Sequence, residues 1–121
     1  MGSMIKPLII FQMAPPHHRK ERGSDLSSAV EALRVGAGLS AWHQIELVLV
    51  FEEPVARLLF PIQELDLNEA DVALNHYGLL RESKATLHTL SDRPVPAGWP
   101  TALSRKKFAA LLARADHFMR F

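Results

Sequence analysis

The sequence predicts an α/β protein in which a mostly parallel sheet of four or five strands has helices on both faces. Residues 7–13 and 44–51 are nearly continuous apolar runs, interrupted in the second run by Glu46. Such runs are typical of strands covered on both sides, whereas half-solvated strands alternate polar and apolar residues. Helical patterns separate the predicted strands, giving the order β-α-β-α-α-β-α-β with a helix in every crossover. Right-handed crossovers then produce three layers, in a flavodoxin-like arrangement.

Four stretches have the apolar spacing of helices that pack on a sheet. They span residues 24–41, 55–60, 68–80 and 104–115. Asn68 and Ser104 can cap the last two helices, because their side chains accept hydrogen bonds from free amides of the first turn. Gly36 and Gly38 predict positions where the first helix packs closely on its neighbours.

The remaining strands are shorter. Residues 85–90 predict a third strand and residues 117–121 a last one. Between them, residues 91–100 contain three prolines, and we expect no regular element there. Residues 17–23 form a polar loop that leaves the carboxyl end of the first strand, the end at which parallel sheets bind ligands.

Length and composition predict one soluble domain. Met1, Gly2 and Ser3 precede a second methionine and resemble a cloning scar, so we assign the domain to residues 4–121. The net charge of +1 gives no argument for nucleic acid or for an anionic membrane. No apolar run reaches the roughly 20 residues of a membrane span, and no signal peptide is recognisable. We therefore expect a cytoplasmic protein.

The chain contains no cysteine. This excludes disulfides, thiolate metal sites and thiol nucleophiles. The six histidines lack the spacing of a metal site, no glycine-rich phosphate loop follows the first strand, and no Gly-x-Ser-x-Gly nucleophile elbow is present. We therefore expect neither a metal nor a cofactor.

Polar residues at strand ends are the candidate ligand-binding groups. The loop after the first strand could hold an anion near the amino end of the next helix, or it is simply a solvated basic loop. Two glutamates follow the central strand and could act as acid or base, or only end the strand as solvated charges. These candidates are His17, His18, Arg19, Arg22, Glu52 and Glu53.

Several stretches, taken in order, carry a family resemblance. They are the Ala14-Pro15 exit of the first strand, residues 32–39, 46–51 and 54–59, and the tail 112–121 with its terminal Arg120-Phe121. Together they resemble the DsrE/DsrF-like sulfur-relay family, which includes the TusB, TusC and TusD subunits of tRNA thiolation. The tail is most similar to the DsrF/TusC branch. The resemblance runs from residue 4 to 121 and implies a DsrE-like fold.

The resemblance also implies a function with one departure. In the DsrE/TusD branch a cysteine at the end of the third main strand carries a persulfide, and that position falls at or next to His88. A histidine cannot hold a persulfide, because the chemistry needs a thiolate. The resemblance therefore implies a non-catalytic subunit related to intracellular sulfur transfer, without its own sulfur-carrying cysteine. We expect it in a trimer or hexamer, homo- or hetero-oligomeric, with related chains and without direct nucleic-acid contact.

Two alternatives stay open, because a fold does not fix a function. The chain could be a small-ligand or anion-binding protein, with His17, His18, Arg19, Arg22, Glu52 and His88 around one cleft. It could also be an enzyme with His88 as general base, although His88 is equally well explained as a structural histidine at a strand end. Apolar residues near element ends are candidates for an interface: Phe60, Leu65, Leu67, Trp99 and Met119.

Overall fold

The computed structural model describes residues 7–14, 27–41, 44–60 and 70–121. They form one five-stranded sheet of order β4-β3-β2-β1-β5, and every pair of neighbouring strands is parallel. The strands are β1 (Leu8–Met13), β2 (Glu46–Glu52), β3 (Thr86–Leu90), β4 (Thr101–Leu103) and β5 (His117–Arg120). The helices are α1 (Ser27–Ser40), α2 (Glu53–Leu59), α3 (Ala70–Glu82) and α4 (Arg105–Arg114). The predicted α/β class with a parallel sheet is confirmed.

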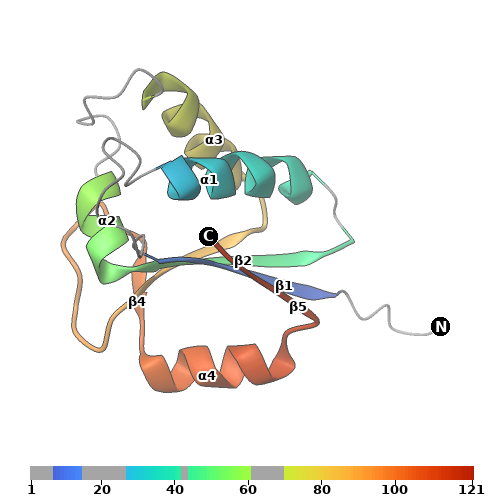
Figure 1. Cartoon of the computed structure of the whole chain (residues 1–121), viewed down its shortest axis with the longest axis vertical. Helices are drawn as coiled ribbons and strands as arrows, with labels where there is room; N and C mark the ends of the chain where they lie inside the picture. Colours follow the sequence, from blue (N-terminus) through green and yellow to red (C-terminus); the bar gives the residue numbers. More distant parts are fainter. Residues whose placement is uncertain (1–6, 15–26, 42–43, 61–69) are drawn as a thin grey trace.

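The helices lie in two unequal layers (Figure 1). α1, α2 and α3 lie on one side of the sheet, and α4 lies alone on the other side. We call these two sides the α1 face and the α4 face. The three layers predicted from the sequence are therefore present, with three helices against one.

The apolar runs in β1 and β2 contribute buried side chains to both faces of the sheet, because successive side chains of a strand point to opposite sides. On the α1 face, Phe11, Leu49 and Phe51 are fully buried against Leu33 of α1 and Leu80 of α3. On the α4 face, a second cluster is formed by Leu8, Ile10, Val48, Val50, Leu90, Leu103 and Phe108. Glu46 is exposed at the start of β2, where it lies 4.0 Å from Arg114.

One crossover differs from the prediction. β3 and β4 are parallel neighbours, but residues 91–100 join them without a helix, so the expectation of a helix in every crossover is wrong. The prolines prevent a regular element, and long-range hydrogen bonds hold the segment instead. Thr89 Oγ1 donates to the carbonyl of Pro100 (2.8 Å), and the Ser91 amide donates to the carbonyl of Leu103 (3.0 Å). The short strand β4 that follows was not predicted.

The two glycines of α1 behave differently. A Cβ at Gly36 would lie 3.4 Å from Leu49 Cδ2 and 3.6 Å from Leu80 Cδ2, which confirms close packing at this position. A Cβ at Gly38 would have no heavy atom within 4 Å, so the same prediction is wrong there. Gly38 is exposed, because it lies two residues further around the helix, away from the sheet.

The predicted interface residues also divide. Phe60 is 6% exposed and its ring lies 5.1 Å from the rings of both Phe51 and Tyr77, so it is a core residue and not an interface residue. Trp99 is half-buried and packs against the α1-face core. Met119 is 47% exposed on β5. Leu65 and Leu67 lie outside the described residues, as does the predicted cap Asn68.

Candidate functional site: the carboxyl edge of the sheet

All strands point the same way, so their carboxyl ends meet at one edge of the sheet, which we call the carboxyl edge. Open parallel sheets bind their ligands at this edge. Here β2 passes directly into α2 at Glu53, and β4 passes into α4 through Ser104. The side chains at these transitions are therefore the first candidates for chemistry.

Glu52 is the central polar side chain of the carboxyl edge. It is the last residue of β2, is half-buried and lies on the α4 face. Its Oε2 accepts a hydrogen bond from Gln12 Nε2 at 2.6 Å and lies 3.6 Å from the guanidinium of Arg120. Gln12 and Arg120 are paired in the ladder between β1 and β5, so one carboxylate links three strands.

Glu53 has a different partner, although it is the next residue. It is the first residue of α2, and its carboxylate lies 4.0 Å from the guanidinium of Arg57 one turn later. Exposed ion pairs of this kind contribute little to stability. The two glutamates that the sequence places together therefore serve separate elements, which does not favour a shared acid–base site.

His88 lies in the middle of β3, two residues before its end, and not at the strand end. Its register partners are Val50 on β2 and Thr101 on β4, and its Nδ1 lies 3.3 Å from Thr101 Oγ1. Burial lowers the pKa of His88 below its ordinary value, and hydrogen bonding with Thr101 partly opposes that shift. Burial therefore favours the neutral form of the imidazole.

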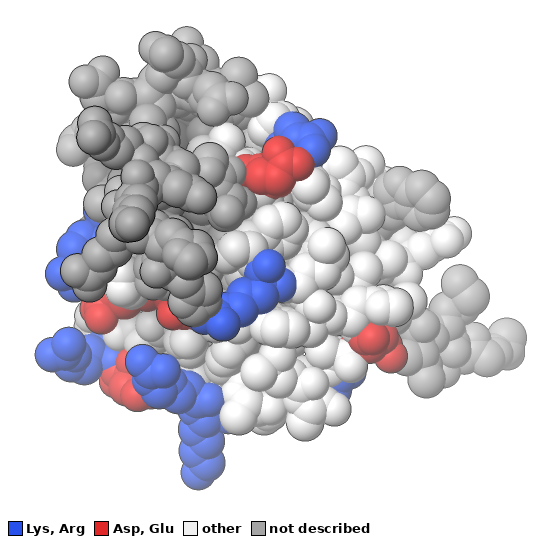
Figure 2. Space-filling model, viewed as in Figure 1, with Lys and Arg blue, Asp and Glu red and all other residues white. Residues whose placement is uncertain are grey.

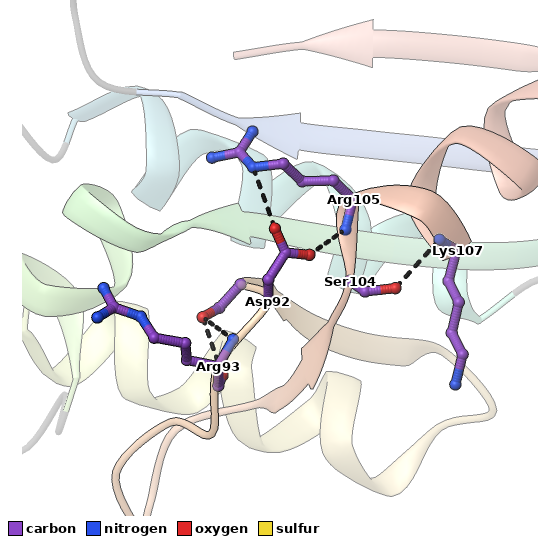
Figure 3. A network of polar contacts seen from close by, with 6 residues as sticks. Asp92, Arg93, Ser104, Arg105 and Lys107 are labelled. Atoms are coloured by element: carbon purple, nitrogen blue, oxygen red, sulfur yellow. Dashed lines mark hydrogen bonds and ion pairs between the residues drawn. The ribbon is translucent and has the colours of Figure 1, made fainter.

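The turn that follows β3 ties the carboxyl edge to α4 (Figure 3). Ser91 Oγ accepts from the Arg93 amide (3.1 Å) and donates to the Arg93 carbonyl (2.9 Å). Asp92 Oδ1 accepts from the amide of Arg105, the first residue of α4, at 2.9 Å. Ser104 Oγ accepts from the Lys107 amide at 3.2 Å, which confirms the predicted cap. Two first-turn amides of α4 are thus already bonded within the protein.

Basic side chains gather around the same turn, at the lower left of Figure 2. All four are exposed: Arg93, Arg105, Lys106 and Lys107. Cations at a helix amino terminus are disfavoured by the helix dipole. Asp92 offsets part of that cost, since its carboxylate also lies 3.7 Å from Arg105 Nε. This basic cluster was not among the sequence-predicted sites.

The predicted cleft is only partly represented in the described residues. His17, His18, Arg19 and Arg22 lie outside them. Glu52 and His88 share the α4 face on adjacent strands, but the hydrogen bonds found for Glu52 and His88 lead to different residues, Gln12 and Thr101. Within residues 7–14, 27–41, 44–60 and 70–121, no cluster of three or more histidines and carboxylates is placed to hold a metal ion.

Two partners of Glu52 were missed by the sequence analysis. Gln12 is the one polar residue of β1, and Arg120 precedes the last residue of the chain. The polar residue inside an apolar strand was a usable signal for Gln12. No sequence signal marked Arg120 as a partner of Glu52, because its position depends on the pairing of β5 with β1. In the part of the chain that is described, no helix has both the length and the apolar character needed to cross a membrane.

Comparison with known proteins bears on the fold. The fold is similar to that of the YchN protein from E. coli, with a TM-score of 0.61 and 12% sequence identity over 97% of this chain and 100% of that chain. No protein-family model matches the sequence, and no curated protein matches it. At 12% identity the likeness shows the fold alone.

Proposed function

We propose that this chain is a non-catalytic subunit of a DsrE-like assembly related to intracellular sulfur transfer, without a sulfur-carrying cysteine of its own. The proposal is carried by a fold similar to that of YchN over 97% of the chain, together with the sequence resemblance to the DsrE/DsrF-like family and the lack of any cysteine. A persulfide relay needs a thiolate that accepts and releases sulfur. A chain that has the fold but no thiol could occupy the place of a subunit without carrying a persulfide itself.

The surroundings of His88 support a structural part for this chain. The imidazole packs between Val50 and Thr101 on the α4 face, and burial lowers its pKa. The segment that follows β3 is irregular and leads to β4 without a helix. Ser91 uses its hydroxyl within the turn, as donor and as acceptor to Arg93. These groups hold the local structure.

The exposed apolar side chains support assembly. Phe118 and Met119 on β5, Leu112 on α4 and Leu79 on α3 are between 37% and 48% exposed. Single exposed apolar residues are ordinary on protein surfaces, but Phe118 and Met119 are consecutive and lie on an edge strand. An edge of this kind favours association with another chain.

The test is to isolate the untagged chain from the cells that produce it and to weigh the complex by native mass spectrometry. We expect a trimer or hexamer that contains a related DsrE-like chain with a cysteine at the end of its third main strand, or copies of this chain alone. Peptide sequencing by mass spectrometry identifies the second chain. A monomer that carries a discrete small molecule would overturn the proposal and favour ligand binding.

A matched control separates assembly from chemistry. His88→Gln keeps a polar side chain of similar length but removes the titratable ring. The proposed subunit keeps its oligomeric mass in this variant, because the side chain has no part in assembly. An enzyme or a binding protein that depends on His88 would lose its ligand mass or its turnover instead.

A further inference from the structure

The outer side of β5 is an unpaired strand edge with a defined pattern of free backbone groups. Among the described residues, β5 is the last strand of the sheet, and β1 is its one pairing partner there. The Phe121 amide donates to the Gln12 carbonyl (2.8 Å), and the Phe121 carbonyl accepts from the Ala14 amide (3.1 Å). In a parallel ladder, alternate residues direct both groups to the same neighbour. The backbone amide and carbonyl of Met119 therefore also point toward β1, whereas those of Phe118 and Arg120 point outward.

Natural sheets protect such edges with proline, with inward-pointing charges or with a covering segment. β5 has no proline, and Phe118 and Met119 are 45% and 47% exposed, on opposite faces of the sheet. Of the two residues whose backbone groups point outward, Phe118 and Arg120, Arg120 is the charged one. Its guanidinium already lies 3.6 Å from the Glu52 carboxylate of its own sheet. The edge therefore presents apolar side chains and free hydrogen-bonding groups together.

We propose that β5 is a self-association edge, at which a second copy of this chain adds its own β5 in antiparallel orientation about a two-fold axis. The two sheets would form one continuous ten-stranded sheet, since each copy contributes the five strands described above. The occupant is a second copy because the pattern of this edge is complementary to itself in one register. That register places Met119 opposite Met119 of the second copy.

In this register each Phe118 lies opposite Arg120 of the other copy. These are hydrogen-bonded pairs, because both residues direct their amide and carbonyl outward, so all the free groups of the strand find partners. The arginine cation also lies beside the electron-rich ring of Phe118, which is a favourable electrostatic match on the α4 face. No pair of like charges stands directly opposite.

The neighbouring register is worse for a reason visible in the structure. Centring the pair on Phe118 would place Arg120 opposite Asp116, a favourable charge pair. However, the Asp116 amide already donates to the Leu8 carbonyl at 2.8 Å, and one Asp116 carboxylate oxygen accepts from the Leu8 amide at 2.7 Å. The backbone of Asp116 is therefore turned toward β1, and this register would leave the outward groups of Arg120 without their full set of partners.

The absence of cysteine makes the test clean, because one introduced thiol is the only thiol. Residues opposite each other in a non-hydrogen-bonded antiparallel pair have Cα atoms about 4.5 Å apart, within the range that a disulfide spans. We expect Met119→Cys to form a disulfide-linked dimer under mild oxidation. Leu79→Cys is the matched control, because Leu79 is equally exposed, at 48%, and lies on helix α3 instead of the edge strand.

The expected rate of cross-linking is on the order of tenfold higher for Met119→Cys than for Leu79→Cys, because only the former geometry suits a disulfide. Phe118→Cys should cross-link more slowly than Met119→Cys, since residue 118 faces residue 120 of the other copy. Equal rates for Met119→Cys and Leu79→Cys would overturn the association. Faster cross-linking of Phe118→Cys would overturn the register.

A second measurement removes the dependence on oxidation. Met119→Lys places two like charges opposite each other, and we expect it to lose the dimer by light scattering, whereas Leu79→Lys keeps it. Both side chains are about half exposed, so neither substitution threatens the core. Retention of the dimer by Met119→Lys would contradict the proposal.

This inference rests on the proposed function only in that it names a surface for assembly, and the two fail separately. A preferential Met119→Cys cross-link, in a chain whose native complex is a dimer that carries a discrete small molecule, would keep the β5 edge and overturn the subunit role. A native complex with a related chain, together with no preferential Met119→Cys cross-link, would keep the subunit role and overturn the β5 edge.

Discussion

The two faces of the sheet are built differently, although the same strands supply both. The α1 face combines large rings and long aliphatic side chains with three helices, and its members are almost all below a few per cent exposure. The α4 face has a smaller cluster under one helix, in which Phe108 is the one buried residue of α4. The same face carries the polar contacts of Gln12, Glu52 and Arg120 at its carboxyl edge. The larger apolar core therefore lies on the α1 face, whereas the α4 face combines a smaller core with polar side chains.

The largest expected effect compares two phenylalanines on opposite faces. Phe51 is fully buried on the α1 face with its ring 5.1 Å from Phe60, whereas Phe108 is 7% exposed under α4. Truncation of a buried phenylalanine costs about 3–5 kcal/mol. We expect Phe51→Ala to reach the upper part of that range and Phe108→Ala to lie at or below its lower end, in urea unfolding followed by circular dichroism.

The milder Phe51→Leu is included in case Phe51→Ala fails to fold, and it should still be less stable than the natural chain. Phe108→Leu is its matched partner on the α4 face. If the variants at position 108 lost as much stability as those at position 51, the two faces would be energetically equal and the comparison would fail.

A smaller effect separates two glycines on the same helix. Leucine at Gly36 would enter the contact between α1, β2 and α3, where the Cβ alone lies 3.4 Å from Leu49 Cδ2. Overpacking of this kind costs about 1–3 kcal/mol. Leucine at Gly38 meets no heavy atom within 4 Å at its Cβ, and replacing glycine within a helix gains up to about 1 kcal/mol.

We therefore expect opposite signs for Gly36→Leu and Gly38→Leu in thermal unfolding. The pair is matched in chemistry and differs only in the neighbours of the helix position. A gain of stability at both positions would show that the α1 face has unused space near Leu49 and Leu80.

The glycines also show which features of the fold can be predicted from the sequence. The fold class was predictable because β1 and β2 are apolar on both faces, which requires cover on both sides. The helical stripe of α1 was equally visible, but a helical pattern alone did not separate Gly36 from Gly38. That distinction requires the position of α3, which packs Leu80 against Gly36.

The β3–β4 connection and the polar contacts at the carboxyl edge depend on contacts that are distant in sequence. β4 has three residues, too few for a periodic pattern, and it is held by Thr89 and Ser91 across the connection. The contact between Glu52 and Arg120 exists because β5 pairs with β1 in a register that places Arg120 on the same face of the sheet as Glu52. Ser104, by contrast, was predictable, because a helix cap is a local arrangement.

The smallest expected effect is the pH dependence that His88 gives to the α4 face. Burial lowers its pKa in the folded chain below the ordinary value of 6.5, so the unfolded chain binds more protons as the solution becomes acidic. Stability then rises with pH across that window. The contribution of the neutral imidazole is complete above the unfolded pKa, declines as the pH falls below it, and levels off below the folded pKa. His88 is half-buried, so the change is modest.

His88→Gln removes this titration and should reduce the loss of unfolding free energy between about pH 7.5 and about pH 5.5, because only the natural chain gains the proton there on unfolding. Urea unfolding of both proteins at the two pH values measures the difference. Equal losses in both proteins would mean that the ring of His88 is fully solvated in the folded chain. In that case its contact with Thr101 contributes nothing to the packing of β3 on β4, and the α4 face would be more open at this strand than the burial of Leu90 and Leu103 indicates.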